Sequence, residues 1–204
     1  MSSASAKGRV RERRNRDEEV LAAAIDVMSE RGYAATSIQE VADRVGVLKG
    51  SLYHYFSSKE ELLARILELS NVASLQIRAE AESHGATPFT ELTTWIRLSA
   101  RWYMDNVELA NIYFAEWRFL TGDRLALTEA RAREYVRHIR NLVDKSKESG
   151  ELTTSIDSRI LTKYIIESLN GVRSWPGTGS FQKIPKQEIE DSFVALTVAA
   201  LHAK

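Results

Sequence analysis

The clearest structural signal in this chain lies in residues 36–62, TSIQEVADRVGVLKGSLYHYFSSKEEL. Thr36 and Ser37 each stand three residues before a Gln or a Glu, which is the spacing of a helix-capping box. Apolar side chains then recur at helical spacing, and Gly46 is a natural helix end. A third helix is expected over about 48–54. Two short helices joined by a Gly-containing turn have the dimensions of a helix-turn-helix unit.

The sequence on either side of this stretch continues the helical pattern. A first helix is expected over 17–32, with acidic residues at its start and Gly32 at its end. A fourth helix should begin after Ser57-Ser58 and run toward His84-Gly85. Because two short helices bury little surface, we expect the first helix to form a third wall and the fourth to act as a connector.

Beyond residue 85, residues that typically begin or end helices divide the chain into further helices. Pro88 suits the first position of a helix, Gly122-Asp123 and Gly150 break the pattern, Asp157 can cap a helix, and Pro185 opens the last one. The chain is therefore predicted to be all-α with about nine helices. We expect a basic flexible arm over 1–16, a helix-turn-helix domain over 17–64 and a second helical domain over 65–204.

Composition and charge exclude several classes of protein. The 204 residues contain no cysteine, which excludes a disulfide scaffold, a thiolate nucleophile and a zinc–thiolate site. No apolar run approaches the roughly 18–20 residues that span a bilayer, and we expect no secretory signal and a cytoplasmic protein. The 28 basic and 28 acidic residues balance, but residues 1–16 carry six basic residues and one acidic residue. This basic arm suits a polyanionic partner, although a solvated tail is the alternative.

Catalytic and metal-binding patterns are missing from the sequence. There is no Gly-x-Ser-x-Gly elbow, no phosphate-binding Gly-x-x-x-x-Gly-Lys-Ser/Thr and no nucleophile–base–orienter set, so we predict neither an enzyme nor a cofactor. Glu134 and His138 stand four residues apart and can share a metal ion, but two ligands do not make a site. We therefore predict a polar pair and no metal.

The stretch 36–62 strongly resembles the DNA-binding segment of the TetR family of transcriptional regulators. Gly46, the run Gly50-Ser51-Leu52-Tyr53, Tyr55-Phe56 and Lys59-Glu60 all stand where the family has them. Leu48, Gly50–His54 and Arg173-Ser174-Trp175 look most similar to the KstR-type regulators, which sense CoA thioesters. The family usually has Ser or Thr where this chain has Leu48, so neither a cap nor a phosphate contact is expected from that residue.

The resemblance and the chemistry of the side chains together predict a DNA-binding surface. Lys49 can donate to guanine O6 or N7, Ser51 can donate or accept, and Gly50 permits close approach of the backbone to DNA. The basic arm can lie in the adjacent minor groove. Tyr53 can instead be a half-buried core aromatic, His54 can be merely exposed, and Tyr55 and Phe56 are expected to be core residues. The expected contacts are Arg11, Arg13, Arg14, Thr36, Ser37, Lys49, Gly50, Ser51, Tyr53, His54 and Lys59.

The second domain carries many aromatic residues, and the resemblance places an effector pocket among them. Interleaved arginines can recognise an anionic end of a largely apolar effector, such as an acyl-CoA or a related carboxylate. The alternatives are an ordinary helical core for the aromatics and surface salt bridges for the arginines. The expected effector residues are Trp95, Arg101, Trp102, Tyr103, Tyr113, Trp117, Arg118, Tyr135, His138 and Trp175.

The last two helices are apolar enough to form a four-helix interface across a two-fold axis, as the resemblance implies. The expected interface residues are Leu161, Ile165, Leu169, Phe193, Leu196 and Ala200, unless this face packs inside one subunit. A homodimer presents two recognition helices, so its operator should be palindromic. The sequence thus favours an effector-responsive repressor. A small-molecule carrier with an idle DNA-binding head and a sequence-indifferent nucleoid protein are the rival hypotheses.

Overall fold

The structure, a computed structural model, describes the backbone of residues 3–202 and the side chains of residues 16–202. Over 3–202 the chain forms nine α-helices, two short 3₁₀ helices and no strand, which confirms the all-α prediction. None of the helices in this range is long and apolar enough to cross a membrane. The chain divides into two compact units, namely unit 1 (residues 1–70 and 111–126) and unit 2 (residues 71–110 and 127–204).

Unit 1 contains the expected helix-turn-helix. It is built from α1 (Ser3–Ala35), α2 (Ile38–Val45), α3 (Lys49–Leu52) and the first part of α4 (Lys59–His84). Residues 111–126 add the end of α6 (Val107–Glu116), η1 (Trp117–Phe119) and the start of α7 (Gly122–Glu148). Its core is a set of buried apolar side chains from several of these helices: Val20, Ala24, Met28, Val41, Leu52, Phe56, Leu62, Leu63 and Ile66.

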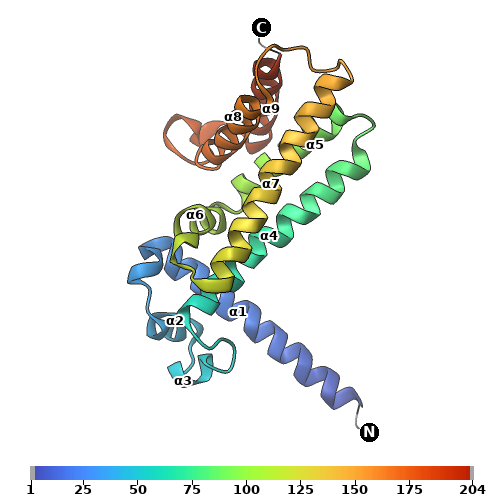
Figure 1. The fold of residues 1–204 in the computed structure, drawn as a ribbon. Coiled ribbons are helices and arrows are strands. Elements are labelled where there is room, and N and C mark those ends of the chain that lie inside the picture. Colours follow the sequence, from blue (N-terminus) through green and yellow to red (C-terminus); the bar gives the residue numbers. More distant parts are fainter. Residues whose placement is uncertain (1–2, 203–204) are drawn as a thin grey trace. The chain divides into compact units, whose positions relative to one another are not determined.

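Helix α1 begins much earlier than predicted. It starts at Ser3, whereas we expected a flexible arm to residue 16 and a helix from residue 17. Residues 3–16 contain no proline, and five of these fourteen residues are Arg, a good helix former, so the helix extends upstream. Figure 1 shows this N-terminal part of α1 extending away from α2 and α3. The expected break at Gly32 is present as a kink with non-helical angles (φ 77°, ψ 162°), although the helix as a whole continues to Ala35.

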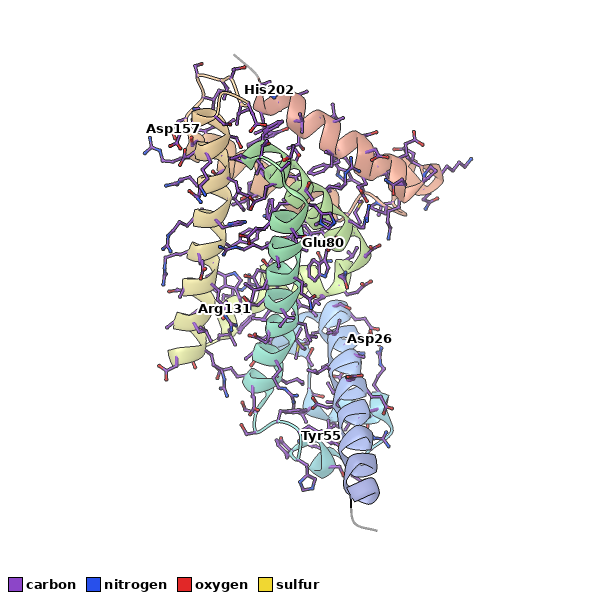
Figure 2. All side chains as sticks on the ribbon, turned by 90° about the vertical axis from the view of Figure 1, so that its right-hand side faces the viewer. Asp26, Tyr55, Glu80, Arg131, Asp157 and His202 are labelled. Atoms are coloured by element: carbon purple, nitrogen blue, oxygen red, sulfur yellow. The ribbon has the colours of Figure 1, made fainter. Side chains whose placement is uncertain are left out.

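Unit 2 is a helical bundle with one apolar core. Helix α5 (Pro88–Asp105) packs against both α8 (Ser158–Val172) and α9 (Lys186–Leu201), and α7 contributes Ile139, Leu142 and Val143 to the same core. The 3₁₀ helix η2 (Gly179–Lys183) lies between α8 and α9 in the chain. In Figure 2, Asp157, before α8, and His202, after α9, lie at the same end of this unit.

Two of the predicted helix starts in unit 2, those of α5 and α8, are formed by side-chain caps. The Thr87 hydroxyl accepts a hydrogen bond from the Thr90 N–H at 3.3 Å, and Pro88 is the first residue of α5. The Asp157 carboxylate accepts a hydrogen bond from the Arg159 N–H at 2.8 Å. The boundary between the units is less simple than the one expected at residues 64 and 65. Helix α4 runs unbroken from unit 1 into unit 2, and residues 111–126 return to unit 1.

Candidate functional site

Helix α2 is held in place by a complete capping box. The Ser37 Oγ accepts from the Glu40 N–H at 3.1 Å, and the Glu40 carboxylate accepts from the Ser37 N–H at 2.9 Å. Hydrogen bonds from Ser37 hold the pKa of Glu40 below its usual value, and the charge of Arg31 adds to this effect. Gly46 ends the helix in the left-handed conformation (φ 75°), so the chain turns directly into α3. Ser37 itself is exposed, as a phosphate contact requires.

Helix α3 is anchored by one buried residue and exposes most of the others. Leu52 is fully buried, and Phe56 behind it is also buried, as predicted. Lys49, Gly50 and His54 are exposed, whereas Ser51 is half-buried. A Cβ atom on Gly50 would meet no other atom of the protein within 4 Å, so the packing of this unit does not require glycine there.

Tyr53 belongs to the exposed edge and not to the core. Its side chain is 48% exposed, and its ring lies 6.3 Å from that of Phe56 in a tilted arrangement. Tyr55 is half-buried, and its carbonyl accepts a hydrogen bond from Arg65 at 2.8 Å. The exposed edge formed by residues 48–50, 53 and 54 is hereafter called the α3 edge.

Two of the predicted DNA contacts are engaged inside unit 1. Thr36 is only 3% exposed, and its hydroxyl donates to the Gly32 carbonyl at 2.9 Å. The Lys59 ammonium donates to the Ala34 carbonyl at 3.1 Å and lies 4.4 Å from the centre of the Tyr33 ring. Burial lowers the pKa of Lys59. Both residues therefore tie the end of α1 to its neighbours, and we remove them from the proposed contacts.

The basic residues of the N-terminal segment lie on a helical backbone. The side chains of Arg11, Arg13 and Arg14 lie outside the described side chains, so their contacts stay predictions. Their backbone, however, belongs to α1. An α-helix is about 10 Å across and does not fit into a minor groove of about 6 Å, so insertion of this segment into the groove is not supported. Contact with phosphates remains compatible with a helix.

Four of the predicted effector residues form a connected aromatic cluster in unit 2. The ring of Trp95, which is buried, lies 5.6 Å from that of Tyr135. The hydroxyl groups of Tyr103 and Tyr135 are 3.3 Å apart, and Trp102 meets Tyr103 edge-on at 5.5 Å. These rings bring apolar surface and two hydroxyl groups together, which is the composition expected of an effector pocket.

The remaining aromatic residues are placed differently. Trp175 stacks on Phe181 at 5.5 Å and meets Phe193 edge-on at 6.0 Å, so it fastens the segment after α8 to the core, as the core alternative predicted. Tyr113, Trp117 and Arg118 belong to unit 1, where Trp117 and Arg118 are exposed. The predicted effector residues are thus divided between the two units.

Arg101 binds a buried carboxylate of its own subunit. Glu190 on α9 is only 2% exposed, and it accepts hydrogen bonds from Arg101 Nε at 2.8 Å, Arg101 Nη2 at 2.9 Å and Arg97 Nη1 at 2.9 Å. Burial alone would raise the pKa of Glu190, but the two arginines outweigh it and lower that pKa. Arg97 also pairs with Asp191. Arg101 is therefore a structural salt-bridge partner, and the predicted effector contact is not supported.

His138 offers an open hydrogen-bonding position. Its Nε2 atom is buried and has no hydrogen-bond partner among the described residues. Burial lowers the pKa of this imidazole, and the nearby charge of Arg78 adds to the shift. Glu134 pairs with Arg78 at 3.5 Å. Across residues 16–202 no three His, Asp or Glu side chains are grouped closely enough to hold a metal ion.

Comparison with known proteins identifies both parts of the chain. Residues 20–66 match the family described as "Bacterial regulatory proteins, tetR family", and residues 85–201 match "Tetracyclin repressor-like, C-terminal domain". The chain belongs to the TetR family. The family assignment agrees with the helix-turn-helix of unit 1. The members of this family are regulatory proteins and not enzymes.

Individual relatives in the TetR family were found in sequence and in structure. The transcriptional repressor KstR2 of Mycobacterium tuberculosis is 45% identical over 60 residues, which are 29% of this chain and 28% of that repressor. The solved structure of KstR2 from M. tuberculosis superposes with a TM-score of 0.82 at 24% identity, over 91% of this chain and 94% of that one. AibR, solved with isovaleryl coenzyme A and operator DNA, gives a TM-score of 0.78 at 23% identity, over 89% of this chain and 97% of AibR.

The predicted dimer residues of this TetR-family chain are mostly buried within one subunit. Leu161, Ile165, Leu169 and Phe193 belong to the core of unit 2, because the apolar stripe of α8 and α9 faces α5. Ala200 is half-buried, and Leu196 is 65% exposed. The exposed apolar residues of α8 are instead Ile160, at 62%, and Tyr164. The sequence pattern could not tell which of two adjacent stripes on these helices faces the core, and the dimer interface itself stays a prediction.

Helix α7 carries a groove that was not predicted. Its volume is about 470 Å³, and it is lined by Ala132, Arg133, Val136, Arg137 and Arg140. Arg133 has a partner in Glu129 at 3.5 Å, whereas Arg137 has no ion-pair partner within the part of the chain whose side chains are described. Arginines spaced three or four residues apart in the sequence indicate that one face of the helix is rich in arginine. Alone, that signal does not separate a groove from a solvated helix surface.

Proposed function

We propose that the chain is a homodimeric transcriptional repressor that binds palindromic operator DNA through α2 and α3. The observation that carries this proposal is the α3 edge, where polar, aromatic and glycine residues are exposed above the buried anchors Leu52 and Phe56. A recognition helix must present a few side chains to the base edges while its other face packs firmly against the rest of the domain. The repressor KstR2 matches over a stretch of 60 residues of this chain.

The proposed contacts divide into base readers and phosphate contacts. Lys49 and Ser51 read base edges, Gly50 permits close approach, and Tyr53 and His54 contact bases or phosphates. Ser37 and the basic residues of α1, including Arg11, Arg13 and Arg14, contact phosphates. Phosphate contacts place the protein on the duplex but carry no sequence information, so specificity rests on the α3 edge and Ser51.

Selection of bound duplexes from a random pool at physiological salt tests the proposal. We expect a palindrome to be recovered, because non-specific affinity is weak under these conditions. Lys49→Ala should weaken binding to that operator about 10- to 100-fold and relax discrimination at one position in each half-site. Lys183→Ala, which removes an exposed lysine from η2, is the matched control and should bind as the unmodified protein does.

The result also decides between the rival functions. Equal binding of all duplexes would identify a sequence-indifferent nucleoid protein. Binding of a small molecule without any retention of DNA at low salt would identify a carrier. Deletion of residues 1–16 should reduce the salt dependence of operator binding by about one unit of slope for each phosphate group that the segment neutralises. An unchanged slope would remove the N-terminal segment from the proposal.

We also propose that the dimer forms through the exposed residues Ile160, Tyr164 and Leu196 of α8 and α9. Large apolar side chains that one subunit leaves exposed are the surface that a two-fold interface would bury. Replacing Ile160 and Leu196 together by glutamate should convert the dimer to a monomer in sedimentation equilibrium and abolish operator binding. The exposed Leu127, replaced by glutamate in the same way, is the control.

The effector is proposed to be a small, largely apolar molecule with an anionic end, such as an acyl-CoA, that releases the operator. The aromatic cluster of Trp95, Trp102, Tyr103 and Tyr135 supports an apolar body, and the open His138 Nε2 supports one polar contact. No arginine is assigned to the anionic end, because Arg101 is already paired and the groove arginines of α7 lie on a different face of that helix from Tyr135 and His138. The dimer can adopt one conformation whose recognition helices match the spacing of the operator half-sites and another whose helices do not. Release needs only that the effector binds the second conformation more tightly than the first. Such a regulatory role implies a cytoplasmic protein.

Titration of the protein–operator complex with isovaleryl-CoA and with longer acyl-CoA thioesters tests this part of the proposal. Free CoA is the control ligand. We expect acyl-CoA to release the operator and Tyr135→Phe to weaken that response while operator affinity is retained, because the ring remains and only the hydroxyl group is removed. Failure of every thioester to bind would remove acyl-CoA as the effector without affecting the operator proposal.

A further inference from the structure

Leu48 is exposed at the start of the recognition helix. Its side chain is 81% exposed, which is more than any other large apolar side chain that the structure describes. It occupies the N-cap position of α3, and its side chain makes no capping hydrogen bond. Its carbonyl accepts from the Ser51 N–H at 2.8 Å, so the backbone at this point is fixed by the first turn of the helix.

This leucine contributes little to the folded subunit. Leucine is among the least favourable residues at an N-cap, where Ser, Thr, Asp or Asn would stabilise the helix by about 1 kcal/mol. An exposed isobutyl group also gains none of the free energy that burial of a leucine provides. Neither capping nor core packing therefore explains Leu48. Its surroundings on the α3 edge are Lys49 and Gly50, which favour an anionic partner over an apolar protein surface.

We propose that Leu48 contacts the 5-methyl group of a thymine in the major groove and thereby selects a T·A base pair in each operator half-site. This inference rests on the proposed function of the α3 edge. The thymine methyl is the apolar group that the base pairs present in the major groove, and hydrogen-bonding side chains do not detect it. Gly50 carries no side chain, so the backbone beside Leu48 can approach the groove closely.

The position of Leu48 next to Lys49 makes the inference more specific. Adjacent residues at the start of a recognition helix contact the same or neighbouring base pairs. If Lys49 donates to a guanine, the thymine selected by Leu48 should lie within one base step of that guanine. Each half-site is therefore expected to contain thymine and guanine at neighbouring positions, and their order follows from the strand that each side chain contacts.

Replacement of thymine by deoxyuridine removes only the methyl group and tests the contact directly. The selected operator is made with deoxyuridine at one thymine position at a time, in both half-sites, and the dissociation constant is measured by fluorescence anisotropy. One buried methyl group corresponds to about a fourfold change, so substitution in both half-sites should weaken binding about 15-fold at a single position. Deoxyuridine outside the half-sites is the control duplex.

Two variants of Leu48 separate methyl contact from folding. Leu48→Ala keeps one methyl group on a shorter side chain and should reduce the discrimination between the thymine and deoxyuridine operators, whereas Leu48→Ser should abolish it. Leu48→Ser introduces a capping side chain and stabilises α3, so its loss of discrimination cannot come from unfolding of that helix. Leu127→Ala, at an exposed leucine of α7, should keep the full discrimination of about 15-fold.

Several results would overturn the inference. These are half-sites without thymine, equal binding of both duplexes by the unmodified protein, or unchanged discrimination in both Leu48 variants. Equal weakening on all duplexes by Leu48→Ala but not by Leu48→Ser would assign a purely structural role. Failure to select any operator would instead refute the proposed function, and this inference with it.

Discussion

Replacing Arg97 and Arg101 together by methionine would leave the Glu190 carboxylate without a cation. The structure gives that carboxylate three hydrogen bonds of 2.8–2.9 Å, and all of them come from these two guanidinium groups. Methionine retains much of the length of the apolar arginine stem, so the change removes charge with little loss of packing. The pairing joins α5 to α9, and its removal acts on the core of unit 2.

The expected loss of stability follows from the burial of the remaining charge. Breaking a buried ion pair from one side typically costs about 3–5 kcal/mol. Glu190 is 2% exposed, but the arginines themselves provide part of its cover, so their removal admits some water. We therefore expect a loss near the lower limit, about 3 kcal/mol, and a fall in Tm of about 6–12 °C for a chain of this size.

Matched variants make the reasoning testable in urea unfolding at a fixed protein concentration. Glu190→Gln alone should cost only about 1–2 kcal/mol, because Arg97 keeps Asp191 and Arg101 can be solvated. Adding Glu190→Met to the double arginine variant removes the uncompensated charge and should recover most of the loss. If the double variant were no less stable than Glu190→Gln, the Glu190 carboxylate would be solvated once the arginines are removed, contrary to the burial that predicts the loss.

The same variants should differ in their dependence on pH. In the unmodified protein the pKa of Glu190 is lowered, so its contribution to stability is present above about pH 4.3 and is lost as the pH falls through the folded-state pKa. Without the arginines, burial should raise this pKa. The double variant should then gain stability relative to the unmodified protein as the pH is lowered from about 7 toward about 5.

Three further predictions concern local structure. Gly32→Ala should destabilise unit 1 by about 1–3 kcal/mol in urea unfolding, because the angles at this residue (φ 77°, ψ 162°) are essentially restricted to glycine; an unchanged midpoint would contradict this. Ser37→Ala should cost about 1 kcal/mol by removing the cap of α2, whereas Ser37→Thr should be nearly neutral. Asp157 has a lowered pKa because of its hydrogen bonds with Arg159, so its contribution is present above about pH 3.9 and is lost below it. Asp157→Asn should therefore flatten the acid limb of the stability profile, and an identical limb in both proteins would argue against this role.

Much of the fold was predictable because local signals and tertiary structure agree. The capping box of Ser37, the left-handed turn at Gly46 and the cap at Asp157 each involve residues within four positions of one another, and each is present. The start of α1 was missed because a run of charged residues is equally typical of a solvated tail and of an exposed helix. At this point helix propensity was a better guide than net charge.

The candidate sites were less predictable because they depend on partners far apart in the chain. Arg101 was expected to bind an effector, but its partner Glu190 is 89 residues away and carries no local signal. Thr36 has a hydroxyl group suited to phosphate, but packing buries it. In α8 the apolar stripes containing Ile160 and Leu161 differ by one residue, and only the packing against α5 decides which one is inside.

The unbroken course of α4 limits how this protein can be cut into parts. The helix has 26 residues, about 39 Å at 1.5 Å per residue, and it passes from one unit into the other without a linker. A fragment ending at residue 70 would also lack the buried Ile112 and Leu120, which the chain returns to unit 1 later. The DNA-binding unit should therefore not fold as an isolated N-terminal fragment. Chimaeras that exchange heads between relatives should keep residues 111–126 with the head, and should join the two parts in register within α4.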